Sequence, residues 1–475
     1  MHIIASMTDH IPRNVLWITT DHMRWDCLGA HNPAVHTPNL DRLVRGGVDF
    51  SRCYGQNPVC MPSRASFMTG LYPAQAGVLT NGQELHPDTP TAVARVFKPH
   101  FTTCQFGKLH FQAHENRDLD PRQRDAYGFD IFNLAEEPGC YEDAYMTWLR
   151  GERPDLVPVF RVPRPSSPQR AAERATYRVL DAPWEFSYSG WLATMIDRHL
   201  TTWGGRRTRQ FIHAGFYAPH PPLNPTTEMM APYVGRELPP ANRRDNEAED
   251  KPEILRRMIL GNRDLSQATL TEYRRHFYAM VTGVDLAVGR ILGALERVGQ
   301  LDDTLIIFAS DHGDYCGDHG MILKSCAWYE EVVRLPLVLH WPRRLRQQTV
   351  DGLTEMVDVL PTLLGLSGLP VPPVMAGRDL SGELLAGRAP AGRPDVYAVD
   401  GPGHLMLRDA RWKYLRFVAA DGPAEVLYDL ESDPHEFVNR AVDPACRDQL
   451  HAMRDRLLTR HIEATRPPNP RPFHF

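Results

Sequence analysis

VLWITT, at residues 15–20, is an apolar and largely β-branched run that stops abruptly at Asp21 and His22. A second run of this kind, TLIIFAS at residues 304–310, stops at Asp311 and His312. Short, continuous apolar runs are typical of strands that are buried on both faces of a parallel sheet. Because ligand sites gather at the carboxyl ends of such strands, we expect both acid–imidazole pairs at one edge of the sheet.

Further apolar runs at residues 210–216 and 335–340 alternate with helical patterns such as residues 273–298. Strands that alternate with helices predict an α/β domain with a mainly parallel sheet. Two other stretches, residues 134–200 and 236–262, are rich in proline and arginine and have weak periodicity. We interpret both as insertions on the sheet scaffold that shape substrate choice.

The pattern changes after about residue 390. Four short strands and one amphipathic helix are expected at residues 396–399, 404–408, 412–418, 425–430 and 447–464. They predict a small antiparallel sheet with a helix. We therefore divide the chain into a catalytic domain, residues 1–390, and a C-terminal α+β subdomain with a Pro-rich tail, residues 391–475.

The composition is that of an ordinary globular protein, with 42% hydrophobic and 23% charged residues. The net charge of -5 offers no broad cationic surface, so neither nucleic acid nor a membrane is expected as a partner. The first residues lack the basic start and apolar core of a secretion signal, which favours a cytoplasmic protein. The eight cysteines have no zinc-finger spacing.

One cysteine stands in an unusual context, Cys60-Met61-Pro62-Ser63-Arg64. Taken alone, these residues fit a helix start, with Pro62 in the first turn and Ser63 satisfying free amide groups. The other interpretation is a catalytic cysteine. The rest of the chain favours the second interpretation.

Together with residues in other parts of the chain, this segment resembles the type I sulfatase family of the alkaline phosphatase superfamily. The family signature C-x-P-S-R-x-x-x-x-T-G is matched from Cys60 to Gly70. Other family motifs occur before and after this segment, in the same order along the chain as in the family. They are found at residues 21–22 (DH), 38–43 (PNLDRL), 107–110 (GKLH), 219–222 (PHPP), 310–313 (SDHG), 317–320 (GDHG), 324 (K) and 427–430 (LYDL). The resemblance covers nearly the whole chain. It implies an alkaline phosphatase-like α/β fold with a large mixed, mainly parallel sheet sandwiched by helices, and a smaller C-terminal antiparallel sheet.

The resemblance also implies that a formylglycine-generating enzyme oxidises Cys60 to formylglycine. The hydrated aldehyde would be the nucleophile and would form a sulfo-enzyme intermediate, from which its second hydroxyl expels sulfate. By the same resemblance, Arg64 and Lys324 neutralise charge near the nucleophile and Lys108 binds the sulfate group.

Two histidines complete the implied catalytic set. His110 would take the proton that triggers sulfate release, while His220 binds the substrate with Lys324 and assists departure of the alcohol. Asp318 and His319 follow the second apolar run closely, and we interpret them as structural support.

The metal site is expected to hold one divalent ion. Asp21 and Asp311 offer hard oxygen ligands, and the resemblance adds His22, His312 and the modified Cys60. Calcium is the first expectation, but two imidazoles make the site softer and favour Mn²⁺ or Zn²⁺ as alternatives. In the other interpretation, His22 supports the ligands without touching the metal.

We therefore predict hydrolysis of an aryl or small alkyl sulfate monoester to an alcohol and inorganic sulfate. The closest alternative is a phosphonate monoester or phosphodiester hydrolase of the same superfamily. Such enzymes tend to carry neutral hydroxyl residues where this chain has Lys108 and His110. An alternative of another class is a catalytically silent relative that only binds an anion. The Pro-rich tail could also reach a neighbouring subunit of a homo-oligomer.

Overall fold

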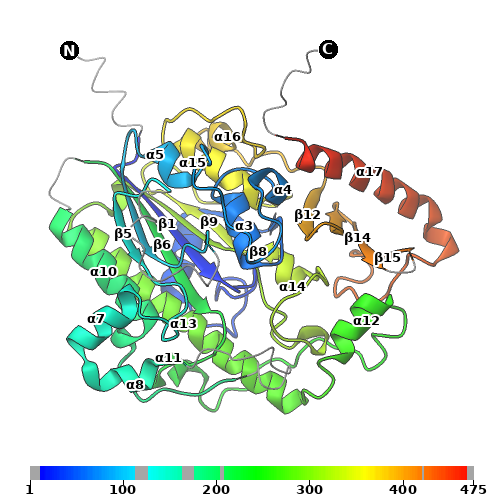
Figure 1. The fold of residues 1–475 in the computed structure, drawn as a ribbon, viewed down its shortest axis with the longest axis horizontal. Coiled ribbons are helices and arrows are strands. Elements are labelled where there is room, and N and C mark those ends of the chain that lie inside the picture. The colour runs from blue at the N-terminus through cyan, green and yellow to red at the C-terminus, as the bar shows by residue number, and fades with distance from the viewer. Residues whose placement is uncertain (1–10, 113–126, 163–175, 204–207, 420–421, 468–475) are drawn as a thin grey trace.

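The computed structural model describes residues 11–112, 127–162, 176–203, 208–419 and 422–467, so most of the Pro-rich tail lies outside the described residues. Within these ranges the centre of the molecule is an eight-stranded sheet with the order β10-β2-β9-β7-β1-β6-β4-β5 (Figure 1). Its strands are β1 (Asn14–Asp21), β2 (Val48–Phe50), β4 (Thr102–Gly107), β5 (Ile131–Leu134), β6 (Gln210–Pro219), β7 (Thr304–Ser310), β9 (Leu337–His340) and β10 (Gln348–Val350). A second, three-stranded sheet contains β3 (Cys53–Tyr54), β8 (Arg334–Leu335) and β11 (Thr354–Glu355).

The two apolar runs that predict the fold are neighbouring strands of the large sheet. The strands from β7 through β1, β6 and β4 to β5 run parallel, whereas β9 is antiparallel to both β7 and β2, so the sheet is mixed and mainly parallel. The register pairs Thr20 of β1 with Ser310 of β7. The two strands therefore end at nearly the same level, and Asp21, the last residue of β1, lies beside Asp311, the first residue after β7, at one edge of the sheet.

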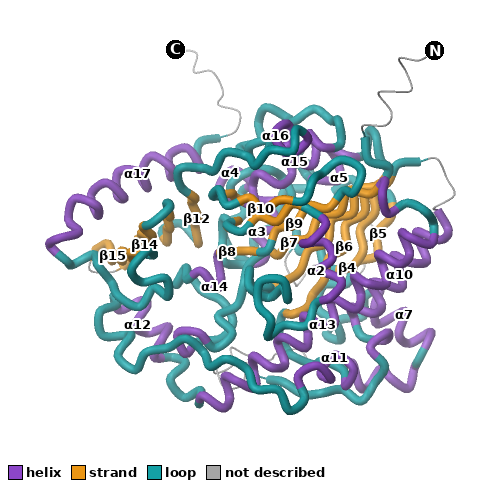
Figure 2. Tube along the Cα trace, turned by 180° about the vertical axis from the view of Figure 1, so that it is seen from behind, coloured by secondary structure: helices purple, strands orange, loops and turns teal. Residues whose placement is uncertain are grey.

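Helices cover both faces of the large sheet (Figure 2). Side chains alternate between the faces of a strand, so Leu16 and Ile18 of β1 pack with one helical layer and Val15 and Trp17 pack with the other. The first layer contains α2 (Pro38–Gly46), α10 (Tyr188–Trp203) and α13 (Gln267–Arg297), and the second contains α3 (Cys60–Phe67), α5 (Val93–Phe97), α15 (Val359–Leu366) and α16 (Ser381–Leu385). Because both faces are covered, every residue of β1 is buried, which explains its unbroken apolar run. Other described helices of this part of the chain are α4 (Pro73–Ala76), α7 (Ala144–Glu152), α8 (Val157–Phe160), α11 (Thr227–Met230), α12 (Glu253–Leu260) and α14 (Glu330–Val333).

One helix differs from the sequence-based expectation. The stretch 134–200, interpreted as an insertion, ends in α10, which packs on β6 and α13 and belongs to the helical layer of the scaffold. Most residues of α10 are buried, so its sequence lacks the polar face that marks a surface helix. Helix α13 is long and apolar enough to cross a membrane, but 72% of its apolar window is buried inside the fold. Burial between the sheet and other helices explains its composition.

The C-terminal region forms the expected antiparallel sheet and helix. The sheet order is β12-β13-β14-β15, with β12 (Val396–Asp400), β13 (His404–Arg408), β14 (Trp412–Ala419) and β15 (Gly422–Asp429), and the helix is α17 (Arg447–Thr465). One face of this sheet packs on α17, where Leu427 shares a core with Met453. The other face packs on the catalytic part, where Leu415 shares a core with Trp328. The small sheet is therefore held between α17 and the large domain (Figure 1).

Candidate active site

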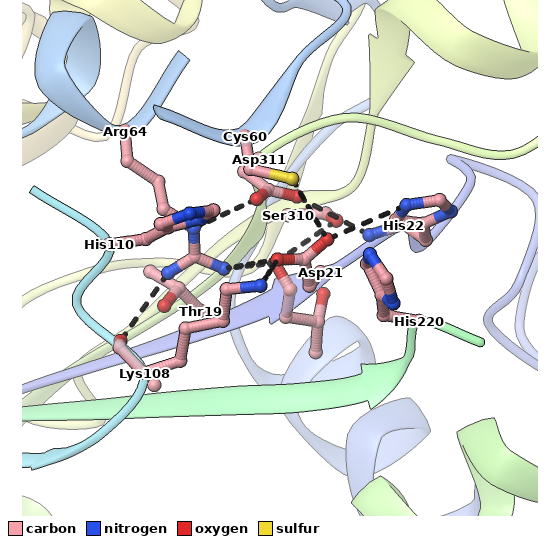
Figure 3. A network of polar contacts seen from close by, with 12 residues as sticks. Thr19, Asp21, His22, Cys60, Arg64, Lys108, His110, His220, Ser310 and Asp311 are labelled. Carbon is pink, nitrogen blue, oxygen red and sulfur yellow. Dashed lines mark hydrogen bonds and ion pairs between the residues drawn. The ribbon is translucent and has the colours of Figure 1, made fainter. Parts of the chain in front are cut away.

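The site is built around two carboxylates at the ends of β1 and β7. Asp21 and Asp311 are completely buried, and the equally buried guanidinium of Arg64 lies between them. Arg64 Nε lies 2.8 Å from Asp311 Oδ2, and Nη2 lies 3.3 Å from Asp21 Oδ2 (Figure 3). This arrangement compensates two buried negative charges that would otherwise be costly.

Helix α3 positions both Cys60 and Arg64. Cys60 is its first residue and Arg64 lies four residues later, so the two side chains share one face of the helix. Pro62 lies in the first turn, where its missing N–H costs nothing. Ser63 does not satisfy free amide groups as the helix-start interpretation expected. Its hydroxyl donates to the backbone carbonyl of Asp311 and thereby connects α3 to the end of β7.

Lys108 reaches the site because two glycines let β4 and β6 approach closely. Gly107 is paired with Gly215, and a Cβ on Gly215 would lie 1.9 Å from the carbonyl oxygen of Lys108. Gly107 also has a φ of +81°, which a residue with a side chain rarely adopts. The turn that follows brings Lys108 Nζ to 2.6 Å from Asp21 Oδ2.

Three imidazoles and one lysine close the site. The ring of His22 has centroid distances of 4.3 Å to His220 and 4.4 Å to His312. Lys324 Nζ lies 2.7 Å from His22 Nε2, 3.0 Å from His312 Nε2 and 2.8 Å from Cys60 Sγ. His220 and Lys324 are partly exposed, whereas the other residues of this group are buried, so these two form the open side of the site.

The pKa values of the two carboxylates are shifted in opposite directions by their surroundings. Burial alone would raise the pKa of Asp21, but the nearby cations, Lys108 foremost, outweigh it and hold that pKa well below its usual range. Burial raises the pKa of Asp311 to about 6, and the charge of Asp21 adds to this effect. Burial also lowers the pKa of His312 to about 4 and that of His220 to about 3. The imidazoles are therefore neutral at pH 7, which is the form that binds metal ions.

The donor atoms fit one divalent cation. Among the described residues, one group of donors within 4.8 Å of one another comprises Asp21, His22, Cys60 and His220, and a second comprises Asp21, Cys60, Asp311 and His312. In both groups Cys60 Sγ stands for the oxygens that formylglycine would carry at this position. Carboxylate, imidazole and oxygen donors together suit a divalent metal ion.

The structure brings the predicted site residues together. His110 is buried two residues beyond Lys108, and its backbone N–H donates to Glu136 Oε1 at 2.9 Å. The interpretation of Asp318 and His319 as structural support agrees with their contacts. Asp318 pairs with Arg24 and Arg274, and His319 bonds Glu247 and stacks on Tyr329 with ring centroids 3.5 Å apart.

Two neighbours of the site were not predicted. Asp314 Oδ2 lies at hydrogen-bond distance, 2.9 Å, from His22 Nδ1, and the only sequence signal of Asp314 is its place three residues after Asp311. The ring of Tyr217 lies 4.9 Å from Lys108 Nζ and has a centroid distance of 4.6 Å to His220. Nothing in the local sequence distinguishes Tyr217 from an ordinary strand residue.

Comparison with known proteins agrees with this geometry. A family model described as Sulfatase matches residues 13–369, which is most of the chain. The chain belongs to the sulfatase family. A second model, described as the C-terminal region of N-sulphoglucosamine sulphohydrolase, matches residues 317–463 of this sulfatase.

The individual relatives of this sulfatase differ in the activities that their names describe. It is 29% identical to a multifunctional alkaline phosphatase superfamily protein of Trinickia caryophylli, covering 91% of this chain and 92% of the relative. It is 26% identical to an arylsulfatase of Clostridium perfringens, covering 95% and 94%. Among solved structures, a phosphonate monoester hydrolase of Agrobacterium radiobacter superposes with a TM-score of 0.80 and 27% identity, covering 95% and 96%. The fold and the enzyme class of this sulfatase are thus established, whereas its preferred ester is not.

Proposed function

We propose that this sulfatase hydrolyses sulfate monoesters of aromatic or small alkyl alcohols to the alcohol and inorganic sulfate. The observation that carries the proposal is that the ammonium groups of Lys108 and Lys324 both reach the site that Asp21 and Cys60 share. Lys324 Nζ lies 2.8 Å from Cys60 Sγ, and Lys108 Nζ lies 2.6 Å from Asp21, which shares the site with Cys60. Two cations placed there can bind the non-bridging oxygens of a sulfate group as charge spreads over them in the transition state.

The other side chains around Cys60 have different roles in the proposed reaction. Arg64 holds Asp21 and Asp311 in place. His220 Nδ1 donates to the carbonyl of Pro221 at 2.6 Å, so Nε2 must take up a proton before it can donate to the ester oxygen on the open side. When present, the metal would withdraw charge from the sulfate oxygens, and formylglycine at position 60 would supply the nucleophilic hydroxyl.

An apolar pocket next to the site supports an aromatic or small alkyl alcohol. Tyr217, whose ring contacts Lys108 and His220, is also part of the pocket wall. The pocket is lined mainly by aromatic and aliphatic side chains, including Tyr145, Phe160, Leu180, Tyr188 and Met229. Such a lining favours an apolar group, with few polar atoms to orient it.

A second candidate function is hydrolysis of phosphonate monoesters. It is favoured by the similarity to the phosphonate monoester hydrolase of Agrobacterium radiobacter. Phosphonate and sulfate monoesters both carry one negative charge, but the sulfate group offers a third non-bridging oxygen where the phosphonate has a carbon substituent. The cationic side chains of Lys108 and Lys324 can use that third oxygen, so they support the sulfate ester.

The deciding experiment compares kcat/KM for 4-nitrophenyl sulfate with that for a 4-nitrophenyl phosphonate monoester. Mass analysis of the peptide containing Cys60 gives the fraction of formylglycine, which is about 18 Da lighter than cysteine. We expect the sulfate to be preferred, and Lys108→Ala to lower its kcat/KM about 100-fold, with a smaller loss for the phosphonate. A higher kcat/KM for the phosphonate in the wild-type enzyme would refute the proposal.

A further inference from the structure

We propose that Asp314 and Tyr273 position His22 as a direct metal ligand, and that the centre therefore prefers a transition-metal ion such as Zn²⁺ to Ca²⁺. The inference rests on the proposed function only in assuming a divalent metal at this site. It assigns a role to a carboxylate that the catalytic scheme leaves unused.

The contacts of Asp314 make it an acceptor for His22. Its side chain is completely buried. Asp314 Oδ1 accepts the backbone N–H of Cys316 at 2.8 Å and that of Leu323 at 3.0 Å. Asp314 Oδ2 accepts the hydroxyl of Tyr273 at 3.1 Å and faces His22 Nδ1 at 2.9 Å. Three donors therefore already point at this carboxylate, which acts as an acceptor in each of these hydrogen bonds. We infer that it also accepts in the fourth, so the proton between Asp314 and His22 lies on Nδ1 of His22.

A proton on Nδ1 leaves the lone pair of His22 on Nε2. His312 has the same arrangement, because its Nδ1 donates to the carbonyl of Gly313 at 2.9 Å. Both Nε2 atoms contact a single cation, the ammonium group of Lys324, at 2.7 and 3.0 Å. The two imidazoles therefore present their lone pairs toward one small region beside Cys60.

The spacing of the donor atoms suits a shared ion. Asp21 Oδ1 lies 3.8 Å from His22 Nε2, 3.5 Å from His312 Nε2 and 3.6 Å from Cys60 Sγ. Ligand atoms that each lie about 2.0–2.3 Å from one ion are separated by roughly 3–4 Å. His22 Nε2 therefore lies at ligand spacing from Asp21 and shares a donor group with Asp21, Cys60 and His220, while His312 lies in the neighbouring group with Asp21, Cys60 and Asp311.

This donor set determines the preferred ion. Calcium takes six to eight oxygen ligands, whereas imidazole nitrogen suits Zn²⁺ and other first-row transition ions. A carboxylate that holds the second ring nitrogen fixes the orientation of the imidazole and raises its basicity as a ligand. The carboxylate of Asp314 supplies this support to His22, and the carbonyl of Gly313 supplies it to His312.

The test measures metal binding by calorimetry on the full-length, metal-stripped protein, with Zn²⁺ and Ca²⁺ titrated separately and no ester present. We expect the wild type to bind Zn²⁺ more tightly than Ca²⁺. His22→Asp should weaken Zn²⁺ binding about 10- to 100-fold and strengthen Ca²⁺ binding. Asp314→Ala should weaken Zn²⁺ binding by a similar factor and leave Ca²⁺ binding nearly unchanged.

Controls separate this result from other effects. Asp311→Ala should abolish binding of both ions, which identifies the site against stray Zn²⁺ binding to other histidines and cysteines. If Asp314→Ala does not fold, Tyr273→Phe removes one hydrogen bond to the same carboxylate and should weaken Zn²⁺ binding to a smaller extent. Tighter Ca²⁺ binding in the wild type, or an unchanged ratio of the two affinities in His22→Asp, overturns the proposal. Neither outcome bears on which ester is cleaved.

Discussion

At the scale of single residues, Arg64 is the side chain on which the site most depends. It is completely buried and pairs with two buried carboxylates, Asp21 and Asp311. Removing one partner of a buried ion pair leaves uncompensated charge in a medium of low polarity. Both the stability of the site and the reaction expected there therefore depend on the guanidinium group of Arg64.

Arg64→Ala should lower the free energy of unfolding of the metal-stripped protein by about 3–5 kcal/mol. Denaturant-induced unfolding measures this loss. The matched control is Arg42→Ala, because Arg42 pairs with Glu296 on the surface, where both side chains are about half exposed. That substitution should cost about 1 kcal/mol or less. Equal losses in the two variants would contradict the structural role of Arg64.

His319 should make stability depend on pH. Burial opposes its charge, but the hydrogen bond and charge of Glu247 outweigh burial and raise its pKa to about 10. The folded protein then holds a proton that the unfolded chain loses near pH 6.5, so the stabilisation is full below pH 6.5 and is lost as pH rises toward 10. The loss amounts to as much as about 1.4 kcal/mol for each pH unit in this window. Unfolding curves at several pH values should show this decline in the wild type, and His319→Gln should lack it. A parallel decline in both proteins would show that other groups cause it.

At the scale of elements, the close contact between β4 and β6 sets the position of Lys108. A methyl group on Gly215 would meet the Lys108 carbonyl at 1.9 Å, and one on Gly107 would meet the Gly215 carbonyl at 2.2 Å. These contacts involve backbone atoms, which cannot move aside as a flexible side chain can. The two glycines thus link the pairing of β4 and β6 directly to the position of Lys108.

Gly215→Ala should push Lys108 away from Asp21 and lower both stability and kcat/KM for a sulfate ester. Gly382→Ala provides the control, because Gly382 lies in α16 and nothing is within 4 Å of the added methyl group. Alanine in a helix is favoured over glycine by roughly 0.5–1 kcal/mol, so this control should keep its activity and gain slightly in stability. Thermal unfolding and steady-state kinetics test both variants. Full activity in Gly215→Ala would show that the strands can adjust without displacing Lys108.

At the scale of the whole molecule, a buried charge network joins the C-terminal subdomain to the catalytic part. Lys413 of β14 is completely buried, and its Nζ lies 2.6 Å from Glu436 Oε1, 2.8 Å from Glu330 Oε1 and 2.9 Å from the carbonyl of Trp328. The residues of this network come from both sides of the boundary expected near residue 390. The boundary therefore marks a change of architecture, and we expect the two parts to unfold together.

Lys413→Met should destabilise the protein by about 3–5 kcal/mol, because it removes a buried cation that contacts both Glu330 and Glu436. Calorimetry should show a single transition that moves to lower temperature as a whole. Lys98→Met is the control, since Lys98 is half exposed and pairs with Asp130 near the surface. A separate early transition confined to residues 391–475 would show that the subdomain unfolds independently.

Local sequence was sufficient for the features that depend on one element at a time. The runs before Asp21 and Asp311 are apolar throughout because both faces of the sheet are covered, and parallel strands bring their carboxyl ends to one edge. The spacing of four residues between Cys60 and Arg64 corresponds to one helical turn, so these residues share a face wherever the helix lies. The short strands and final helix after residue 390 were likewise visible in local periodicity.

The tertiary structure decided what depends on contacts between distant segments. His22 and Asp314 are 292 residues apart, and no local pattern indicates that their side chains meet. The apolar pocket takes its wall from several elements, and α10 lost its recognisable polar face because the fold buries it on most sides. Strand register and helix packing create these contacts, and neither is encoded in the residues next to the site. The sequence by itself thus indicated the family to which the chain belongs, whereas the folded chain determined which side chains surround Cys60 and which line the apolar pocket beside it.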